Sequence, residues 1–354
     1  MSLLSKYLMR RILSSTLLVL LVLLSLSVLF EFIGQIDDVK GDFSIALALL
    51  YAVLRLPQLS FEMMPIAVLI GSLLGLGALA NNSELVVMRT AGLSIARLAG
   101  MVAISGAVLL VVTVLIGEFI GPPLDYFARN MRDEARSSQQ GRDVGRAAWV
   151  KDGPVILHLE RVNTEFDFGR IYLFRFNDDN TLRSIARAEN SGIDENDNWV
   201  LENFRETRFQ DNGVQVVSSS VAIESFEVDS DVLGITLVKP ISLSARGLMS
   251  YIDYLKKNDL SSIRYEMELW SRVSKTVAVA IMPILALAFV FGPLRSSGAG
   301  ARLMIGVMVG LGYFLASETL SSSGQVFNLN PVLVTSLPTI VLMVIALSAL
   351  RRVR

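Results

Sequence analysis

The feature that most constrains this chain is a series of long apolar runs that flank a polar middle. A bilayer core about 30 Å thick is crossed by about 20 helical residues, since each residue advances an α-helix by about 1.5 Å. Runs of that length occur at about 12–33, 58–80, 98–121, 273–294, 303–323 and 331–350. The sequence therefore predicts an α-helical membrane protein with six transmembrane helices.

Two apolar segments need separate interpretation. The first run exceeds the apolar core of a signal peptide, which is about 7–15 residues, and no A-x-A cleavage pattern follows it. We therefore expect this run to remain as an anchor. The shorter run at 44–56 is interrupted by Arg55, and it is either an interfacial helix or an extension of the second span.

Lysine and arginine near the span ends predict the orientation, because short loops rich in these residues stay in the cytoplasm. They gather at the N-terminus, after the second and fourth spans and at the C-terminus: Lys6, Arg10, Arg11, Arg89, Arg97, Arg295, Arg302, Arg351, Arg352 and Arg354. The loop after the first span instead carries Asp37, Asp38 and Asp42, together with Lys40. Both termini are therefore predicted to be cytoplasmic, and the insertion after the third span faces the opposite side.

The polar middle predicts a β-rich domain. Short β-favouring runs recur at 147–151, 155–161, 170–176, 181–188, 198–204, 207–210 and 214–218. Turns rich in Asp and Asn separate them, a spacing typical of an antiparallel sandwich or jelly roll. The apolar residues on both faces of 171–176 fit a strand covered on two sides, or an open β-fold that receives a ligand.

These features divide the chain into three segments. Residues 1–135 hold the first three transmembrane helices, with a short cytoplasmic helix at about 82–92. Residues 136–242 form the inserted all-β, jelly-roll-like domain, and residues 243–354 hold a connecting helix and the last three transmembrane helices.

The composition excludes several kinds of chemistry. The chain has no cysteine, which rules out disulfides, thiolate metal sites and cysteine nucleophiles. Its one histidine, His158, cannot form a zinc site without cysteine partners. No P-loop, G-x-S-x-G or H-E-x-x-H string is present, and the net charge of −1 gives no indication of nucleic-acid binding. We therefore expect neither an enzyme nor a cofactor or metal held by this chain.

Ionisable residues near or within the spans are candidates for function, because each costs about 2.5–3.5 kcal/mol at the bilayer centre. They are Glu31, Arg55, Glu62, Glu118, Arg129, Arg132 and Glu318. Four cations are predicted at the outer-leaflet interface: Lys40, Arg55, Arg129 and Arg132. Cations at that depth suit an amphiphile with an anionic head, since arginine donors match phosphate oxygens. Snorkelling at the span ends explains each of these charged residues alone. Candidates for the apolar wall beneath them are Met63, Met64, Tyr313 and Phe314, although core packing is the better explanation for each of these four alone.

The cytoplasmic connection at 82–92 predicts a short helix. Asn82 or Ser83 can cap it, Glu84 lies in its first turn and Gly92 can end it. Leu85 and Met88 share one face. A short capped helix of this kind either docks into the groove of an ATPase or lies on the lipid surface.

Three strings carry a resemblance to a known family. They are SELVVM at 83–88 with Ala91-Gly92, GEF at 117–119 followed by ARNMR at 128–132, and FGPLRS at 291–296. Together they resemble the LptF/LptG permease family, and most closely its LptG branch, over essentially the whole chain. The resemblance implies an ABC transporter permease that extracts lipopolysaccharide from the bacterial inner membrane and passes it to a periplasmic bridge.

The resemblance also implies partners. An LptF-like permease would complete a heterodimer, an LptB-like ATPase dimer would bind ATP and Mg, and LptC- and LptA-like proteins would receive the lipid. Both termini would be cytoplasmic and the β-domain periplasmic. Ser83, Glu84, Leu85, Met88 and Gly92 would belong to the ATPase-coupling helix, whose glutamate meets the ATPase.

The resemblance is incomplete at the expected phosphate site. Arg129 and Arg132 match family residues that contact lipid A phosphates. Where the family has further basic residues, this sequence has Glu31, Asp37 and Asp38 after the first span, and Gln58 after Pro57. Arg55 or Lys40 would then substitute for the missing cations.

Two other functions remain open from the sequence. One is a membrane-anchored periplasmic adaptor that moves no lipid. The other is a proton-coupled lipid flippase with Glu62, Glu118 or Glu318 as proton relays. An intramembrane enzyme would need a paired catalytic set within the spans, and the sequence contains none.

Overall fold

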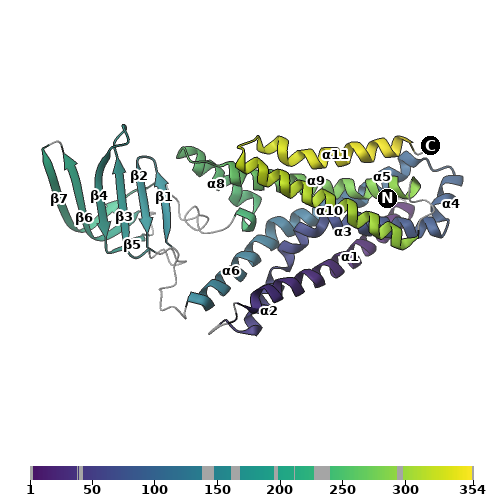
Figure 1. Cartoon of the computed structure of the whole chain (residues 1–354), viewed down its shortest axis with the longest axis horizontal. Helices are drawn as coiled ribbons and strands as arrows, with labels where there is room; N and C mark the ends of the chain where they lie inside the picture. The colour runs from purple at the N-terminus through teal and green to yellow at the C-terminus, as the bar shows by residue number, and fades with distance from the viewer. Residues whose placement is uncertain are drawn as a thin grey trace. The chain divides into compact units, whose positions relative to one another are not determined.

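The computed structural model describes residues 3–37, 39, 43–137, 147–160, 168–194, 198–210, 212–226, 240–292 and 298–352. The chain divides into two compact units (Figure 1). The helical unit comprises Met1–Val39, Ser44–Arg129 and Ile263–Arg354, and the β unit comprises Lys40–Phe43 and Asn130–Ser262.

Within the described residues, six helices are long and apolar enough to cross a membrane, which confirms the predicted number of spans. They are α1 (Leu3–Ile36), α3 (Leu56–Asn81), the continuous helix Ile95–Arg136, α9 (Ile263–Phe291), α10 (Ala299–Val326) and α11 (Pro331–Arg352). The third of these consists of α5 (Ile95–Leu115), the π-helical turn η1 (Ile116–Ile120) and α6 (Gly121–Ser137). The short apolar run at 44–56 forms a separate helix, α2 (Ile45–Leu54), which meets α3 at Arg55.

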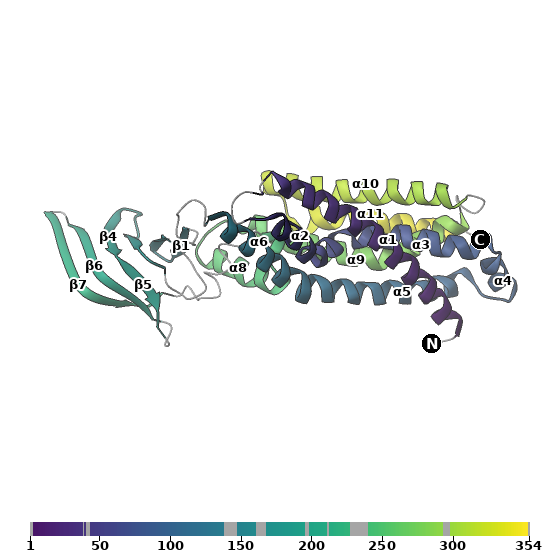
Figure 2. The same cartoon turned by 90° about the horizontal axis from the view of Figure 1, so that it is seen from below.

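The helical unit is centred on α3 and α9, which pack against each other and against the surrounding helices (Figures 1 and 2). Glycines allow close approach: a Cβ on Gly71 of α3 would lie 2.4 Å from the Thr16 Cα of α1, and one on Gly106 of α5 would lie 2.6 Å from the Ala280 carbonyl of α9. The outer faces of α1, α10 and α11 remain apolar and exposed. Exposed apolar surface on this scale requires lipid or another protein chain to cover it.

The short helix α4 (Glu84–Thr90) lies at the end of the helical unit that also holds both ends of the chain (Figures 1 and 2). Its position follows from the chain order, because α1 and α3 run in opposite directions and α11 returns to the same end. The opposite end of the unit holds α2 and the junction at Arg55.

The β unit contains one antiparallel sheet with seven described strands. They are β1 (Ala148–Asp152), β2 (Val155–Leu159), β3 (Ile171–Phe176), β4 (Leu182–Ala188), β5 (Asn190–Ile193), β6 (Trp199–Gln210) and β7 (Gly213–Glu224). Strands β1, β2, β3, β4 and β6 are neighbours in that order, and β5 and β7 also pair with β6. The predicted inserted β-domain is therefore confirmed.

Two details of the strand prediction are wrong. The runs 198–204 and 207–210 form one strand, β6, which pairs with β5 along its first half and with β4 along its second. Asn203 has a φ of 53°, so the strand bends there without ending its ladder with β7. The short strand β5 was not predicted, because Asn190 and Gly192 weaken its β signal.

One face of the sheet forms the core of the β unit, which includes Leu157, Leu173, Leu201 and Trp199. The unit also includes α8 (Ala245–Lys257) and the 3₁₀ turn η3 (Pro240–Ser242). Tyr254 of α8 fixes the helix to the β1–β2 hairpin, since its hydroxyl donates to the Lys151 carbonyl (2.9 Å) and accepts from the Lys151 amide (3.0 Å).

Candidate functional site

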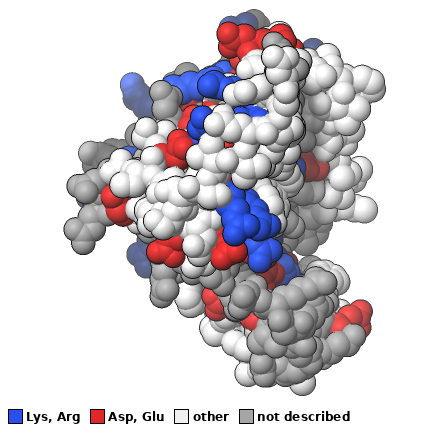
Figure 3. All heavy atoms as spheres, turned by 90° about the vertical axis from the view of Figure 1, so that its left-hand side faces the viewer, with Lys and Arg blue, Asp and Glu red and all other residues white. Residues whose placement is uncertain are grey.

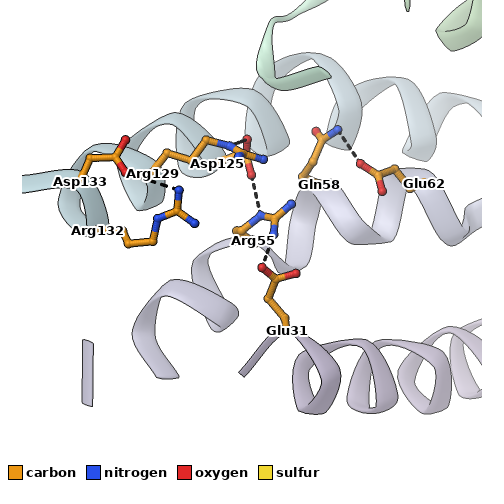
Figure 4. Close-up of polar contacts among 8 residues, drawn as sticks. All are labelled: Glu31, Arg55, Gln58, Glu62, Asp125, Arg129, Arg132 and Asp133. Carbon is orange, nitrogen blue, oxygen red and sulfur yellow. Dashed lines mark hydrogen bonds and ion pairs between the residues drawn. The ribbon is translucent and has the colours of Figure 1, made fainter. Parts of the chain in front are cut away.

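A chain of four charged residues joins α1, α3 and α6 at the Ile36 end of the helical unit (Figure 4). Arg55 donates to Glu31 of α1, and its Nε donates to Asp125 Oδ1 at 2.9 Å. Asp125 Oδ2 accepts from the Nε of Arg129 at 2.7 Å. Asp125 is 0% exposed, and a carboxylate buried to that extent remains ionised only when cations and donors compensate it.

The four charges sum to zero, whereas the sequence predicted a cluster of cations at this level. Arg55 and Arg129 were predicted at one level, and the structure brings them together through Asp125. In this arrangement carboxylates hold both guanidiniums. A phosphate group would therefore bind by replacing carboxylate contacts, since arginine offers the same forked donors to either anion.

Asp125 was missed by the sequence reasoning, although a signal existed. It precedes Arg129 by four residues on α6, a spacing that places two side chains on the same helix face. Arg132 also lies on α6 and pairs with Asp133 at 3.4 Å. Lys40, the remaining predicted cation, lies outside the described residues.

A second polar cluster surrounds the π-helical turn η1. Arg272 of α9 is buried, donates from Nη1 to the Gly117 carbonyl at 3.0 Å, and lies 3.7 Å from Glu268 Oε1. Its guanidinium lies 5.3 Å from the ring centre of Phe61, in cation–π geometry. A Cβ at Gly117 would lie 2.4 Å from Phe61 Cδ2, so any larger residue here would force the Phe61 ring to move. Arg272 is not among the residues predicted from sequence.

Of the three acidic residues considered as relays, Glu62 has an amide partner, since Gln58 Nε2 donates to Glu62 Oε1 at 3.2 Å (Figure 4). Glu118 lies within η1. Glu318 lies on α10.

The predicted apolar wall divides into two pairs. Met64 and Tyr313 are buried in the core of the helical unit, and the Tyr313 hydroxyl is hydrogen-bonded to Thr339 Oγ1 of α11 at 3.1 Å. Met63 and Phe314 are only partly buried. In this structure Met64 and Tyr313 therefore pack in the core of the helical unit.

The helix α4 differs from its prediction at its start, whereas Leu85 and Met88 share one face as predicted. The side chain of Ser83 makes no capping hydrogen bond, and its backbone is left-handed with a φ of 61°. Leu85 is 1% exposed and packs in the core, and Met88 packs against that core, so the face they share points into the unit. The exposed large apolar side chains of α4 are Val86 and Val87.

The end of α4 agrees with the prediction. Gly92 follows the helix with a φ of 91°, and its amide donates to the Arg89 carbonyl at 3.0 Å. Glu84, in the first turn, accepts a hydrogen bond from the hydroxyl of Tyr7 on α1 at 2.7 Å.

Charges on the molecular surface are mixed in sign. On the face drawn in Figure 3, basic and acidic side chains lie next to each other among uncharged residues. In the β unit, for example, Arg175 pairs with Glu206 and Glu224. The described residues on this face therefore form no uniformly basic area of the kind that binds nucleic acid.

Six membrane-spanning helices with an antiparallel sheet inserted between the third and fourth define a multi-pass membrane protein. The family described as lipopolysaccharide export system permease LptF/LptG matches residues 6–352, and the chain belongs to this family.

Curated relatives agree with this assignment. The chain is 31% identical over 353 residues to lipopolysaccharide export system permease protein LptG of Escherichia coli K12, covering 99% of this chain and 98% of the relative. It is 30% identical over 355 residues to LptG of Haemophilus influenzae, covering 99% of each. LptF of Escherichia coli K12 is 25% identical over 249 residues, which span 63% of this chain and 66% of the relative. The resemblance found in the sequence is therefore confirmed.

Proposed function

We propose that this chain is a permease subunit of an ABC transporter that extracts lipopolysaccharide from the inner membrane and passes it to a periplasmic bridge. The observation that carries the proposal is the match to the lipopolysaccharide export permease family over residues 6–352. Relatives of nearly equal length are LptG permeases, so we expect each part of this chain to have the role of the corresponding part of an LptG permease.

The proposed orientation places both termini and α4 in the cytoplasm and the β unit in the periplasm. Basic residues support it, because Lys6, Arg10 and Arg11 begin α1 and Arg351 and Arg352 end α11 at the α4 end of the helical unit. The positive-inside rule places such an end in the cytoplasm. The cluster of Arg55, Asp125 and Arg129 then lies towards the outer leaflet.

The proposed partners follow the family. An LptF-like permease would cover exposed apolar faces of the spans as the second half of a heterodimer. An LptB-like ATPase dimer would bind ATP and Mg, while LptC- and LptA-like proteins would receive the lipid. The exposed valines of α4, Val86 and Val87, offer the ATPase a small apolar surface beside Glu84.

The lipid head group would bind at the charged cluster by anion exchange. Arg55 and Arg129 would transfer from Glu31 and Asp125 to lipid phosphates, with Lys40 and Arg132 as further cations. Such an exchange conserves the charge-assisted hydrogen bonds to each guanidinium, but it leaves the buried Asp125 without its cations, so the movement of the helices must also expose Asp125 to water or a proton must neutralise it. Met63 and Phe314 would contact the acyl chains.

Co-purification tests the proposal. The wild-type chain and a Glu84→Arg variant, each co-expressed with a candidate permease partner and ATPase, are isolated in detergent and their subunit stoichiometry is measured. The expected result is stoichiometric ATPase with the wild type and loss of the ATPase alone with Glu84→Arg. Absence of the ATPase from both preparations would contradict the proposal and favour a membrane-anchored adaptor.

A further inference from the structure

The helix α4 is joined to α1 by a hydrogen bond between residues far apart in sequence. The Tyr7 hydroxyl donates to Glu84 Oε2 at 2.7 Å, across a separation of 77 residues. The pair is partly buried, which shields the bond from competing water. A hydroxyl bonded to a carboxylate is among the stronger hydrogen bonds in proteins.

Arg11 fixes the direction of this hydrogen bond. Its Nε and Nη2 lie 3.3 and 3.2 Å from the Tyr7 hydroxyl oxygen, and its guanidinium lies 5.3 Å from the centre of the Tyr7 ring. Arginine only donates hydrogen bonds, so the hydroxyl oxygen accepts from Arg11 while its own hydrogen points to Glu84. Tyr7 is thereby held between a cation on its own helix and an anion on α4.

The helix α4 depends on such contacts because it has little stability of its own. It has 7 residues, and helices this short are unstable in isolation. Its N-cap residue, Ser83, supplies no side-chain hydrogen bond and has a left-handed backbone that glycine adopts more easily. The start of α4 is therefore held in place by tertiary contacts. The hydrogen bond of Glu84 is a polar contact of this kind to α1.

The other contacts of this region lead to different helices. Arg89 of α4 lies 5.8 Å from the ring centre of Phe291 at the end of α9. Arg302 of α10 donates to the Gly77 carbonyl at 2.7 Å and to Asn81 Oδ1 at 3.1 Å, which holds the last turn of α3. Tyr7 thus provides a polar contact from α4 to α1, whereas Arg89 of α4 reaches α9 and Arg302 of α10 holds α3.

The helix α1 connects this contact to the charged cluster at the other end of the unit. It is continuous from Leu3 to Ile36, with Tyr7 near its start and Glu31 near its end. Glu31 is one of the two carboxylates that hold Arg55. A displacement of α1 would therefore alter a contact of Arg55, since a helix transmits motion along its axis more readily than a loop does.

We propose that Tyr7 is a positioning residue that ties α4 to α1, so that a displacement of α4 is passed to the first span through the Tyr7–Glu84 hydrogen bond. This inference rests on the proposed function for its consequence, since the ATPase would supply the displacement. The Tyr7–Glu84 hydrogen bond itself lies within this chain. The two parts can therefore be tested separately.

The first test measures the mobility of α4 in the full chain without an ATPase. The sequence has no cysteine, so Val87→Cys, at a side chain that is 63% exposed, carries a single spin label on α4. Tyr7→Phe in this background removes only the hydroxyl and is expected to raise the mobility of the label. Tyr126→Phe on α6 is the matched control and should leave the mobility unchanged. Equal mobility in wild type and Tyr7→Phe, or an equal increase with Tyr126→Phe, would overturn the proposal.

The second test measures lipid released per ATP hydrolysed by the reconstituted complex. Tyr7→Phe is expected to keep the ATPase bound and active while lipid release per ATP falls roughly tenfold, the loss typical of one hydrogen bond to a charged group. The loss should be smaller when Tyr7→Phe is added to Glu84→Gln, because glutamine leaves the Tyr7 hydroxyl only a neutral and weaker acceptor. Unchanged release per ATP in Tyr7→Phe would refute the transmission role. Failure of the wild type to release lipid would refute the proposed function, while the label measurement would still decide whether Tyr7 positions α4.

Discussion

The helical unit and the β unit each contain a buried carboxylate that binds two arginines. In the helical unit, Asp125 is 0% exposed and accepts from Arg55 and Arg129. In the β unit, Glu206 is 3% exposed and accepts from Arg175 at 2.5 Å and from Arg208 at 2.8 Å. The local chemistry is the same in both units, so the surroundings must distinguish their roles.

The two networks differ in what they join. Glu206 also accepts from the Ser184 hydroxyl at 2.8 Å, and Arg175 extends to Glu224, so this network links neighbouring strands of one sheet. The Asp125 network joins three separate helical elements of the bundle. An ion-pair pattern alone therefore does not identify a ligand site. A site is indicated where the pattern joins elements whose rearrangement would expose the cations.

The largest effect is expected from Asp125→Ala. This substitution leaves Arg55 and Arg129 without their shared anion, and breaking a buried ion pair typically costs about 3–5 kcal/mol. Thermal unfolding of the purified chain in detergent measures the loss. Asp253→Ala, at an exposed i,i+4 pair with Lys257, is the matched control and should cost less than about 1 kcal/mol. Equal stability of wild type and Asp125→Ala would show that this network does not stabilise the fold.

Arg55→Ala should separate the two networks by function. We expect lipid release to fall about tenfold or more, since one charge-assisted contact contributes about 1.5–3 kcal/mol. Arg175→Ala removes the equivalent arginine of the β unit and should leave lipid release unchanged in protein that remains folded. Equal losses of lipid release in the two variants would contradict the different roles assigned to the two networks.

Arg55→Lys is a smaller change at the same position and separates the effect of charge from that of donor geometry. Lysine keeps the positive charge but lacks the forked donors that bind Glu31 and Asp125 at once. We expect lipid release between that of wild type and Arg55→Ala, measured in the same vesicles. Wild-type lipid release by Arg55→Lys would show that the site needs only the positive charge and not the forked donors of arginine.

Acid should weaken the β network through Glu206. Burial by itself raises the pKa of Glu206, but the Ser184 hydroxyl and the Arg208 and Arg175 guanidiniums outweigh it and hold the pKa below its ordinary value of 4.5. The folded β unit therefore binds fewer protons than the unfolded chain, and its extra stability is present above that pH and is lost as the pH falls through the folded value.

Hydrogen exchange of β6 amides in the full chain can follow this loss. Protection should decrease in wild type as the pH falls below 4.5, after correction for the intrinsic exchange rate. Glu206→Gln should be less protected at neutral pH and should lose less on acidification. Parallel curves for the two proteins would contradict the role given to this carboxylate.

The coarse architecture was predictable because it depends on local composition. Apolar runs long enough to cross a bilayer predict the spans, and Asp- and Asn-rich turns predict the inserted sheet. The short helix between the second and third spans was predictable for the same reason, since Gly92 and the preceding periodicity are local signals.

The contacts that define the site were not predictable, because they join residues distant in sequence. Asp125 meets Arg55 across 70 residues, and Tyr7 meets Glu84 across 77. The inward direction of Leu85 likewise depends on which side of α4 faces the bundle, which its own sequence does not determine. The contact between Arg272 and Gly117 depends on a π-helical turn, for which the sequence has no reliable signal.

Lipid release from vesicles distinguishes an ATP-driven permease from a proton-coupled flippase. The chain is reconstituted with its permease partner and ATPase in proteoliposomes containing lipopolysaccharide, and transfer to a soluble periplasmic acceptor is followed over time. We expect transfer that requires ATP hydrolysis and continues after the proton gradient is collapsed. Transfer that proceeds without ATP and stops when the gradient is collapsed would contradict the account and favour a proton-coupled flippase.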